Sequence, residues 1–340
     1  MSKRATQRDV ALRAGVSPAT VSYIINNQTG GNISISQDTR QRVMKAVHEL
    51  NYLPDITARG LSTRKTQLLA VMLPDITDPF YTLVFRGAQA VAESQGYDLM
   101  VYDVDLRSKR EKKFIDTVLR RRVDGVIMLT TFTTSEDVNR LLEADIQVAI
   151  VGHSPDIKGG DRVGLDEMDG VHQVMEHLYG RGHRRIAFLT GPLDWLQART
   201  RKAGYVRSLQ EMGLKYEEDL VREGTFQREG TSELVESLFG DVARANPPTA
   251  LFCSNDNMAI EAVRTLTKMG FRVPDDVAVA GFDNIPQAEA MIPGLTTLDH
   301  IPMEMGKAAT TFLLERINSD ASLPDRKKIL TGKLIVRETT

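Results

Sequence analysis

The sequence predicts an α/β protein with a small helical part at its N-terminus and a larger part made of two doubly wound lobes. Helix signals without strand signals occupy the first fifty residues, and from Leu68 onward short apolar runs alternate with amphipathic stretches. Such alternation is typical of parallel sheets covered by helices on both faces. The length of 340 residues also favours several domains over one core.

Charge is distributed unevenly along the chain. The net charge is −2, but residues 1–65 hold ten Lys/Arg against four Asp/Glu, and the remaining 275 residues hold 33 against 41. A basic head on an acidic body is expected when one end of a protein meets the phosphates of a nucleic acid. A solvated basic surface has the same composition, so charge alone leaves both interpretations open.

Composition argues against membrane and secreted proteins. The longest apolar run, Leu68–Leu73, is too short to span a bilayer. Lys3 and Arg4 are followed by a polar stretch and not by the apolar region of a secretory signal. The single cysteine, Cys253, excludes an intrachain disulfide and fits a reducing compartment. We therefore expect a cytoplasmic protein with no membrane partner.

The first fifty residues contain signals for three helices, at about Thr6–Ala14, Ser17–Asn26 and Ser36–Leu50. Thr6 and Ser17 are expected N-caps, and Pro18 falls in the first turn of the second helix, where its missing N–H costs nothing. Gly15 ends the first helix. A tight turn between two short helices predicts a helix-turn-helix, whose second helix suits the major groove of DNA. A helical hairpin without a DNA role has the same periodicity.

The rest of the chain predicts two α/β lobes. Apolar runs predict strands at Leu68–Leu73, Tyr97–Tyr102, Gly125–Leu129, Val148–Val151, Arg185–Leu189, Thr249–Cys253 and Val277–Gly281. Amphipathic stretches predict helices at Phe80–Ser94, Lys109–Arg121, Glu136–Ala144, Asp169–Gly180, Leu196–Met212, Gln227–Phe239 and Asp256–Met269. Ligands of doubly wound folds bind at the carboxyl ends of the strands, which predicts a ligand site in the cleft between the lobes.

No catalytic signature stands out in the sequence. No glycine-rich phosphate loop follows the first predicted strand, and no Ser/His/Asp motif is evident. His172 and His177 are five residues apart, which is the wrong spacing for two ligands on one helix face. Cys253 falls on a buried strand and is expected to be a core residue. We therefore expect no enzyme activity, no metal and no cofactor.

Short motifs resemble the LacI/GalR (lactose/galactose repressor) family of bacterial transcriptional regulators. In the helical part these are RDVA at 8–11, AGVS at 14–17, ATVS at 19–22 and LNYLP at 50–54. In the rest of the chain they include PDITDPFY at 74–81, GHRRIA at 182–187, ND at 255–256 and GFDN at 281–284. The resemblance covers the whole chain. It implies a DNA-binding helix-turn-helix, a hinge helix, and a core shared with periplasmic sugar-binding proteins.

The resemblance also implies which residues contact DNA. These are Thr6, Ser17, Pro18, Ala19, Thr20, Ser22, Tyr23, Asn26, Arg59 and Leu61. In the hinge, Leu61 would wedge between base pairs in the minor groove and Arg59 would hold a phosphate; a plain interdomain linker is the alternative. Tyr23 stands where family members often carry arginine, and tyrosine lacks the bidentate contact to guanine. A different operator is therefore expected. The loop 27–35 is longer than in the shortest family members.

Residues after several strands match family positions that contact effectors: Phe80, Tyr81, Trp195, Gln197, Arg201, Phe226, Asn255 and Asp283. Arg201 and Asp283 together can donate to and accept from neighbouring hydroxyl groups, unless they form only a salt bridge between the lobes. Trp195 and Phe226 can stack on a sugar ring or a flat base, although large aromatics also fill cores. Asn255 could instead cap the following helix. Gly152 stands where some sugar-responsive members have aspartate.

Together these observations predict a homodimeric repressor that binds a palindromic double-stranded operator under the control of a small effector. A monosaccharide or small glycoside is favoured, with a nucleoside or purine next. We place the DNA-binding domain at 1–54, the hinge at 55–66 and the core at 67–340, with lobes at about 67–166 plus 298–325 and 167–297 plus 326–340. No heptad run follows the last predicted strand, Lys328–Val336, so a dimer is expected. The alternatives are an enzyme with an accessory DNA module and a sugar receptor for transport.

Overall fold

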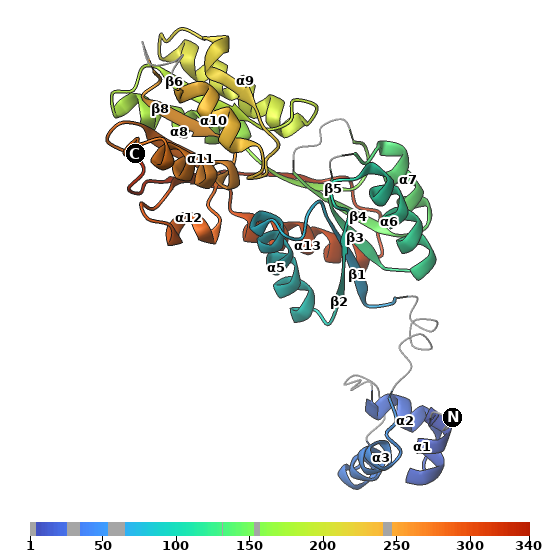
Figure 1. Ribbon diagram of the computed structural model, residues 1–340. Helices are drawn as coiled ribbons and strands as arrows, with labels where there is room; N and C mark the ends of the chain where they lie inside the picture. The colour runs from blue at the N-terminus through green and yellow to red at the C-terminus, as the bar shows by residue number, and fades with distance from the viewer. Residues whose placement is uncertain (1–4, 26–34, 54–64, 131, 153–156, 241–246) are drawn as a thin grey trace. The chain divides into compact units, whose positions relative to one another are not determined.

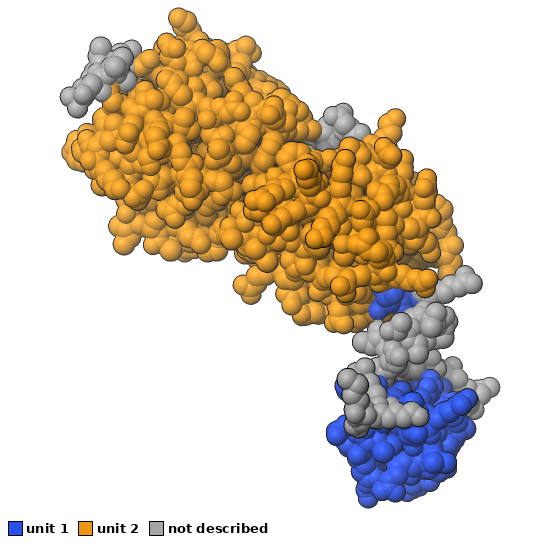
Figure 2. All heavy atoms as spheres, turned by 45° about the vertical axis from the view of Figure 1, so that its right-hand side comes forward, with its two compact units in different colours: residues 1–66 blue, residues 67–340 orange. Residues whose placement is uncertain are grey.

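The computed structural model describes residues 5–25, 35–53, 65–130, 132–152, 157–240 and 247–340. The chain divides into two compact units, residues 1–66 and residues 67–340 (Figure 2). Within the described residues, no helix has the length and apolar character needed to cross a membrane.

The first unit contains the three predicted helices, α1 (Gln7–Ala14), α2 (Pro18–Ile25) and α3 (Gln37–Glu49). The predicted cap of α1 is present: Thr6 Oγ1 accepts from the backbone N–H of Asp9, and the Asp9 carboxylate accepts from the backbone N–H of Thr6 at 2.8 Å. Gly15 ends α1 with a φ of 67°. The helices enclose a small core of Val10, Ala11, Ala14, Val21, Ile24, Val43 and Ala46.

The first lobe of the second unit is built on a parallel sheet with the order β11-β5-β4-β3-β1-β2. Its strands are β1 (Leu68–Leu73), β2 (Asp98–Asp103), β3 (Gly125–Leu129), β4 (Gln147–Val151), β5 (Asp161–Leu165) and β11 (Lys327–Leu330). Helices α5 (Pro79–Ser94) and α13 (Pro302–Asn318) cover one face, and α6 (Ser108–Arg121) and α7 (Ser135–Glu143) cover the other (Figure 1). Alternate residues of β1 point to opposite faces of the sheet. Leu69 and Val71 pack toward α5, and Ala70 and Met72 pack toward α6.

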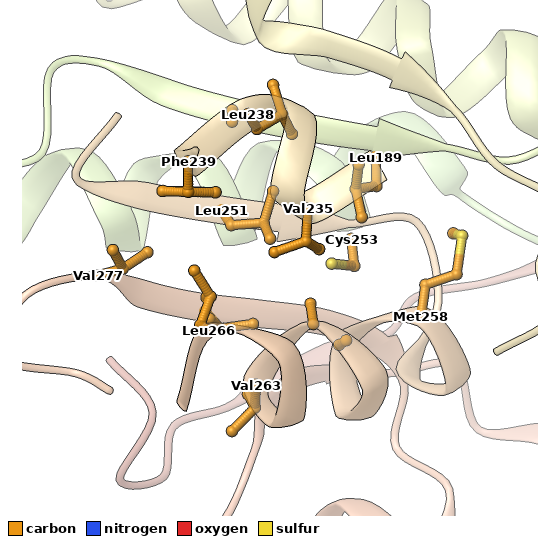
Figure 3. Packing of buried hydrophobic residues seen from close by; sticks show 14 of the residues in the cluster. Leu189, Val235, Leu238, Phe239, Leu251, Cys253, Met258, Val263, Leu266 and Val277 are labelled. Carbon is orange, nitrogen blue, oxygen red and sulfur yellow. The ribbon is translucent and has the colours of Figure 1, made fainter. Parts of the chain in front are cut away.

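The second lobe repeats this plan with the order β12-β10-β9-β8-β6-β7. Its strands are β6 (Ile186–Thr190), β7 (Val221–Glu223), β8 (Ala250–Cys253), β9 (Ala278–Asp283), β10 (Thr296–Asp299) and β12 (Lys333–Ile335), of which β12 alone runs antiparallel to its described neighbour. Helices α8 (Glu167–Gly180) and α9 (Leu196–Glu211) cover one face, and α10 (Thr231–Phe239) and α11 (Asp256–Lys268) cover the other. Figure 3 shows Cys253 among Val235, Met258 and Leu189 in the second core, as predicted for a buried cysteine.

The chain crosses between the two sheets three times. It passes from β5 to β6 by way of α8, from β10 to β11 by way of α13, and from β11 to β12 at residues 331–332. Both sheets reverse their strand order beside their first strand, which is the point where doubly wound folds bind ligands. Because the chain crosses between the sheets three times, the two points of reversal, one in each sheet, face a common cleft.

The predicted last strand, Lys328–Val336, is wrong as a single element. The segment forms two strands, β11 and β12, which belong to different sheets. The prediction that all of 326–340 belongs to the second lobe is therefore wrong for β11, which pairs with β5 of the first lobe. Gly332 lies at the crossing, where a Cβ atom would stand 2.6 Å from the carbonyl oxygen of Asp299. Only glycine lets the chain pass this close to β10. Strands β5, β7 and β10 and helix α13 were also not predicted from the sequence.

Helices α5 and α13 pack through two glycines, and this contact is open to a test of stability. A Cβ atom at Gly306 would lie 2.0 Å from the carbonyl oxygen of Val84. We expect Gly306→Ala to lower the free energy of unfolding by about 1–3 kcal/mol or more, because the two backbones must separate. A Cβ atom added to the helical Gly180 would meet no described atom within 4 Å, so Gly180→Ala should leave stability unchanged or raise it by up to about 1 kcal/mol. Urea unfolding of both variants measures the difference, and equal midpoints would contradict the packing argument.

Candidate functional site

A cleft between the two sheets contains about 690 Å³ of empty space, counting the part that is open to solvent. The structure places every predicted effector residue in its lining: Phe80, Tyr81, Trp195, Gln197, Arg201, Phe226, Asn255 and Asp283. The lining also includes residues that sequence patterns did not indicate, among them Asp78, Thr130, Glu167, His300 and Met305. The cleft thus lies where the carboxyl ends of the strands of both sheets meet.

Arg201, on α9, lies at the centre of a buried charge cluster. Its Nε donates to Glu167 Oε2 at 2.6 Å, one Nη donates to the carbonyl oxygen of Ser254, and the other lies 3.8 Å from Asp283 Oδ1. Its side chain is 5% exposed. Arg201 and Asp283 both belong to the second lobe, so their pair does not bridge the lobes.

Burial opposes the charged form of Arg201, but the neighbouring carboxylates of Glu167 and Asp283 outweigh it and raise the pKa of the guanidinium. The guanidinium carbon also lies 3.9 Å from the centre of the Phe282 ring, in a cation–π contact. Arg201 is therefore held as a cation.

His300 completes this cluster from the segment between β10 and α13. Its Nδ1 lies 2.9 Å from Asp283 Oδ1, and its ring centre is 4.7 Å from that of Phe80. The same Nδ1 lies 3.4 Å from Arg201 Nη2. His300 thus joins the polar cluster to the aromatic part of the cleft.

The aromatic wall consists of Trp195 and Phe226, whose ring centres are 5.6 Å apart with an interplanar angle of 37°. Phe226 has a φ of 65°, which is uncommon for a residue with a side chain. Gly191 makes room for its ring, because a Cβ atom there would lie 2.2 Å from ring carbons. Asn255 holds this loop by donating to the carbonyl oxygen of Phe226 at 2.7 Å.

Asn255 serves both of the roles that its sequence context suggested. Its Oδ1 accepts from the backbone N–H of Met258 at 3.0 Å, so it caps α11, and it also lines the cleft. The cap fixes the first turn of α11, which carries Asn257 toward the other lobe.

Asp78 and Asn257 connect the two lobes across the cleft. Asp78 caps α5 by accepting from the backbone N–H of Phe80 at 2.9 Å, and its other oxygen accepts from Asn257 Nδ2 at 3.1 Å. Burial, together with the negative charge of Asp283, raises the pKa of Asp78 to about 7. The sequence offered a signal for Asp78, since an aspartate before Pro79 is a typical helix start.

Of the predicted DNA-contacting residues that the structure describes, all but Thr6 lie in α2 or directly before it. Ser17, Pro18 and Ala19 are exposed, and Thr20, Ser22 and Tyr23 are partly exposed. Thr6 is exposed at the start of α1. Ser17 Oγ accepts from the backbone N–H of Thr20 at 3.1 Å, which makes Ser17 the cap of α2. Asn26, Arg59 and Leu61, and most of the loop 27–35, lie outside the described residues.

The raised pKa of Asp78 predicts a dependence of stability on pH. A carboxyl group whose folded pKa lies above its ordinary value of 3.8 favours the folded state while it is protonated. That stabilisation is lost as the pH rises from about 4 through about 7. We expect Asp78→Asn to unfold at a higher temperature than the parent at pH 8 and at a similar temperature near pH 4.

Thermal unfolding between pH 4 and pH 8 tests this, with Asp98→Asn, which removes an exposed carboxylate from β2, as the control. A gap between parent and Asp78→Asn that stays constant over this range would contradict the assignment.

Comparison with known proteins gives a consistent result for both units. Residues 6–55 match the sequence family described as bacterial regulatory proteins, lacI family, and residues 175–340 match a periplasmic binding protein-like domain. The chain is 32% identical to the HTH-type transcriptional repressor CytR of Escherichia coli (strain K12), over 99% of this chain and 96% of that protein. Among solved structures it is similar to the lac repressor dimer bound to operator and the anti-inducer ONPF, with a TM-score of 0.85, 27% identity and 99% of each chain covered. It is also similar to the complex of the transcriptional regulator CelR with cellobiose, with a TM-score of 0.72 and 29% identity over 99% of this chain and 100% of that one.

Proposed function

Because the chain belongs to the LacI family of bacterial regulatory proteins, we propose that a neutral, hydroxyl-rich ligand in the cleft controls its affinity for DNA. The protein is a ligand-responsive, DNA-binding transcriptional repressor and not an enzyme, in keeping with its relatives. The ligand is a monosaccharide or a small glycoside. The protein acts in the cytoplasm as a homodimer on a palindromic operator.

The choice of ligand class rests on one observation: the polar cluster of Arg201, Asp283 and His300 lies beside an aromatic wall. Arg201 already donates to Glu167 and to the carbonyl oxygen of Ser254, so few of its donors remain for a ligand. Each oxygen of a carboxylate can accept more than one hydrogen bond, so Asp283 can still accept from a ligand. A ligand that donates several hydrogen bonds and also offers a C–H face fits this lining, and a sugar does both.

The balance of charge in the cleft disfavours an anionic ligand. Asp78, Glu167 and Asp283 line it, against the single guanidinium of Arg201. A phosphate group placed here would meet an excess of carboxyl groups in a partly buried site, where like charges repel more strongly than in water. We therefore propose that the protein binds a neutral sugar and rejects the corresponding sugar phosphate.

A nucleoside is the second candidate, and the aromatic pairs favour it. Phe80 with His300, and Trp195 with Phe226, place two pairs of rings along the cleft. A flat base can stack on such rings while its ribose donates to carboxylates. The ligands of the neighbours differ, since the CelR structure is a complex with cellobiose and the lac repressor structure contains ONPF.

On the DNA side, we propose that Ser17, Pro18, Ala19, Thr20, Ser22 and Tyr23, together with Thr6 and Asn26, face the operator. The exposed start of α2 and the two-helix geometry support this role. We also propose that Arg59 holds a phosphate and Leu61 is a minor-groove wedge in the hinge. By linkage, a ligand that weakens DNA binding is itself bound more weakly by the DNA-bound protein.

Thermal unfolding against sugars, sugar phosphates and nucleosides tests the ligand class. A ligand present at a hundred times its dissociation constant should stabilise the protein by about 2.7 kcal/mol. We expect a neutral sugar to raise the unfolding temperature and its phosphate ester to have no effect. A response only to nucleosides would favour the second candidate, and a response to the sugar phosphate alone would contradict the charge argument.

Asp283→Asn separates ligand binding from DNA binding. The amide keeps the size of the side chain but removes a carboxylate that accepts from the ligand, so we expect the thermal response to the ligand to disappear. The variant keeps every predicted DNA-contacting residue, so we expect it still to bind the operator in the absence of ligand. Asp194→Asn, an exposed change that does not line the cleft, is the control. A full response by Asp283→Asn would overturn the assignment of the site.

A further inference from the structure

Helix α6 carries a concentration of positive charge that the ligand site does not use. Residues 107–122 hold eight Lys/Arg and two Asp/Glu, whereas the rest of residues 67–340 holds 25 Lys/Arg and 39 Asp/Glu. This one segment is strongly basic in an otherwise acidic unit. One of its two acidic residues, Glu111, is buried and accepts hydrogen bonds from Thr130 and Thr133.

The cations form a stripe on the outer face of the helix. Glu111, Phe114, Ile115 and Val118 are its buried side. Lys109, Lys112, Lys113 and Arg120 are exposed and follow helical spacing on the opposite side, over about 16 Å of helix. Arg121 and Arg122 extend the exposed charge at its end.

Within the described part of the chain, these six cations form no ion pair. The neighbouring carboxylates are engaged elsewhere: Asp105 pairs with Arg107 and Arg110, and Asp116 pairs with Arg140 of α7. Unpaired, exposed cations are free to bind an anionic partner and release its counterions.

Helix stability accounts for only part of this charge. Arg120 and Arg121 lie in the last turn of α6, where cations interact favourably with the helix dipole. Lys109 lies in the first turn, where the dipole is positive and repels it, whereas Lys112 and Lys113 lie in the second turn, beyond the range of the dipole. The N-cap position is Arg107, which makes no side-chain capping bond. The helix dipole therefore does not account for the three lysines.

The basic end of α6 lies where the chain arrives from the DNA-binding unit. The backbone N–H of Gln67, the first residue of the second unit, donates to Asp124 Oδ2 at 2.9 Å, two residues beyond Arg122. The backbone N–H of Asp124 donates to the carbonyl oxygen of Leu68 at 2.9 Å. The thirteen residues 54–66 that join this point to α3 and its exit span at most about 45 Å. The linker thus joins the second unit beside the end of α6 that carries Arg120, Arg121 and Arg122.

We propose that the exposed stripe of α6 is a second DNA-binding surface, which contacts the phosphates of the duplex that flanks the operator. Phosphates recur every 3.4 Å along each strand, so the stripe is long enough to meet several of them. Such contacts add affinity without sequence preference, and each neutralised phosphate makes binding more sensitive to salt. DNA is favoured over an acidic protein because the linker from the DNA-binding unit enters the second unit beside this helix.

Two duplexes and two double variants of the full-length protein test the proposal. One duplex carries the operator alone, and the other extends it by about ten base pairs, roughly 34 Å, on each side. Lys112→Gln/Lys113→Gln neutralises the stripe. Lys327→Gln/Lys328→Gln removes two exposed lysines from β11 of the same lobe and is the matched control. Dissociation constants are measured between 50 and 200 mM salt, with urea unfolding to confirm that both variants are folded.

On the extended duplex, we expect the parent and the control to lose about a hundredfold more affinity than the stripe variant over this range of salt, which corresponds to four phosphate contacts in the dimer, two from each subunit. On the operator-only duplex, all three proteins should show the same dependence on salt. A stripe variant that matches the parent on the extended duplex would overturn the proposal and leave an acidic protein as the partner of α6. An equal loss in the control would show a general charge effect and would also overturn it.

Discussion

The buried guanidinium of Arg201 is the constraint around which the second unit is arranged. A charge that is 5% exposed must be matched by partners, because an isolated buried charge costs several kcal/mol. The partners come from separate parts of the chain: Glu167 begins α8 after the first crossing between the lobes, Asp283 ends β9, and His300 precedes α13 at the second crossing. One side chain thus holds both crossing segments against α9. Loss of the guanidinium would leave two buried carboxylates without their cation. The segments that cross between the lobes would then lose a contact that holds them in place.

This arrangement explains how a ligand in the cleft can act at a distance. Arg201 and Asp283 belong both to the residues proposed to contact the ligand and to the cluster that holds the crossing segments, so a ligand that donates to Asp283 or bonds to His300 would also change the support of a crossing segment. The bond from Asn257 to Asp78 adds a direct connection across the cleft. A ligand shifts an equilibrium between lobe arrangements only by its difference in affinity for them. The lining offers such a difference, because residues of both lobes contribute to it.

Sequence patterns predicted those parts of the fold in which local chemistry and burial agree. Strands with continuous apolar runs, such as β1 and β3, were predicted with their observed limits, since a buried parallel strand needs little else. Strand β5 was missed because it begins with Asp161, which is fully buried only through Arg316 and Arg326, two residues more than 150 positions away. The eight residues predicted to contact an effector could be placed at the cleft because strand ends and family motifs mark them. Glu167 and His300 could not, because their place in the cleft depends on crossings that no local pattern reveals.

The distribution of charge adds a physical link between the two functions. Outside α6, the second unit is acidic, so its surface repels DNA and limits non-specific binding by the protein as a whole. Repulsion of this kind leaves recognition to the helical unit, whose exposed start of α2 can reach bases. On the proposal made for α6, the exposed cations of that helix offer DNA an attractive surface on a unit whose net charge is otherwise negative. Because Gln67 is bonded to Asp124 next to the end of that helix, the linker from the DNA-binding unit enters the second unit beside the proposed surface.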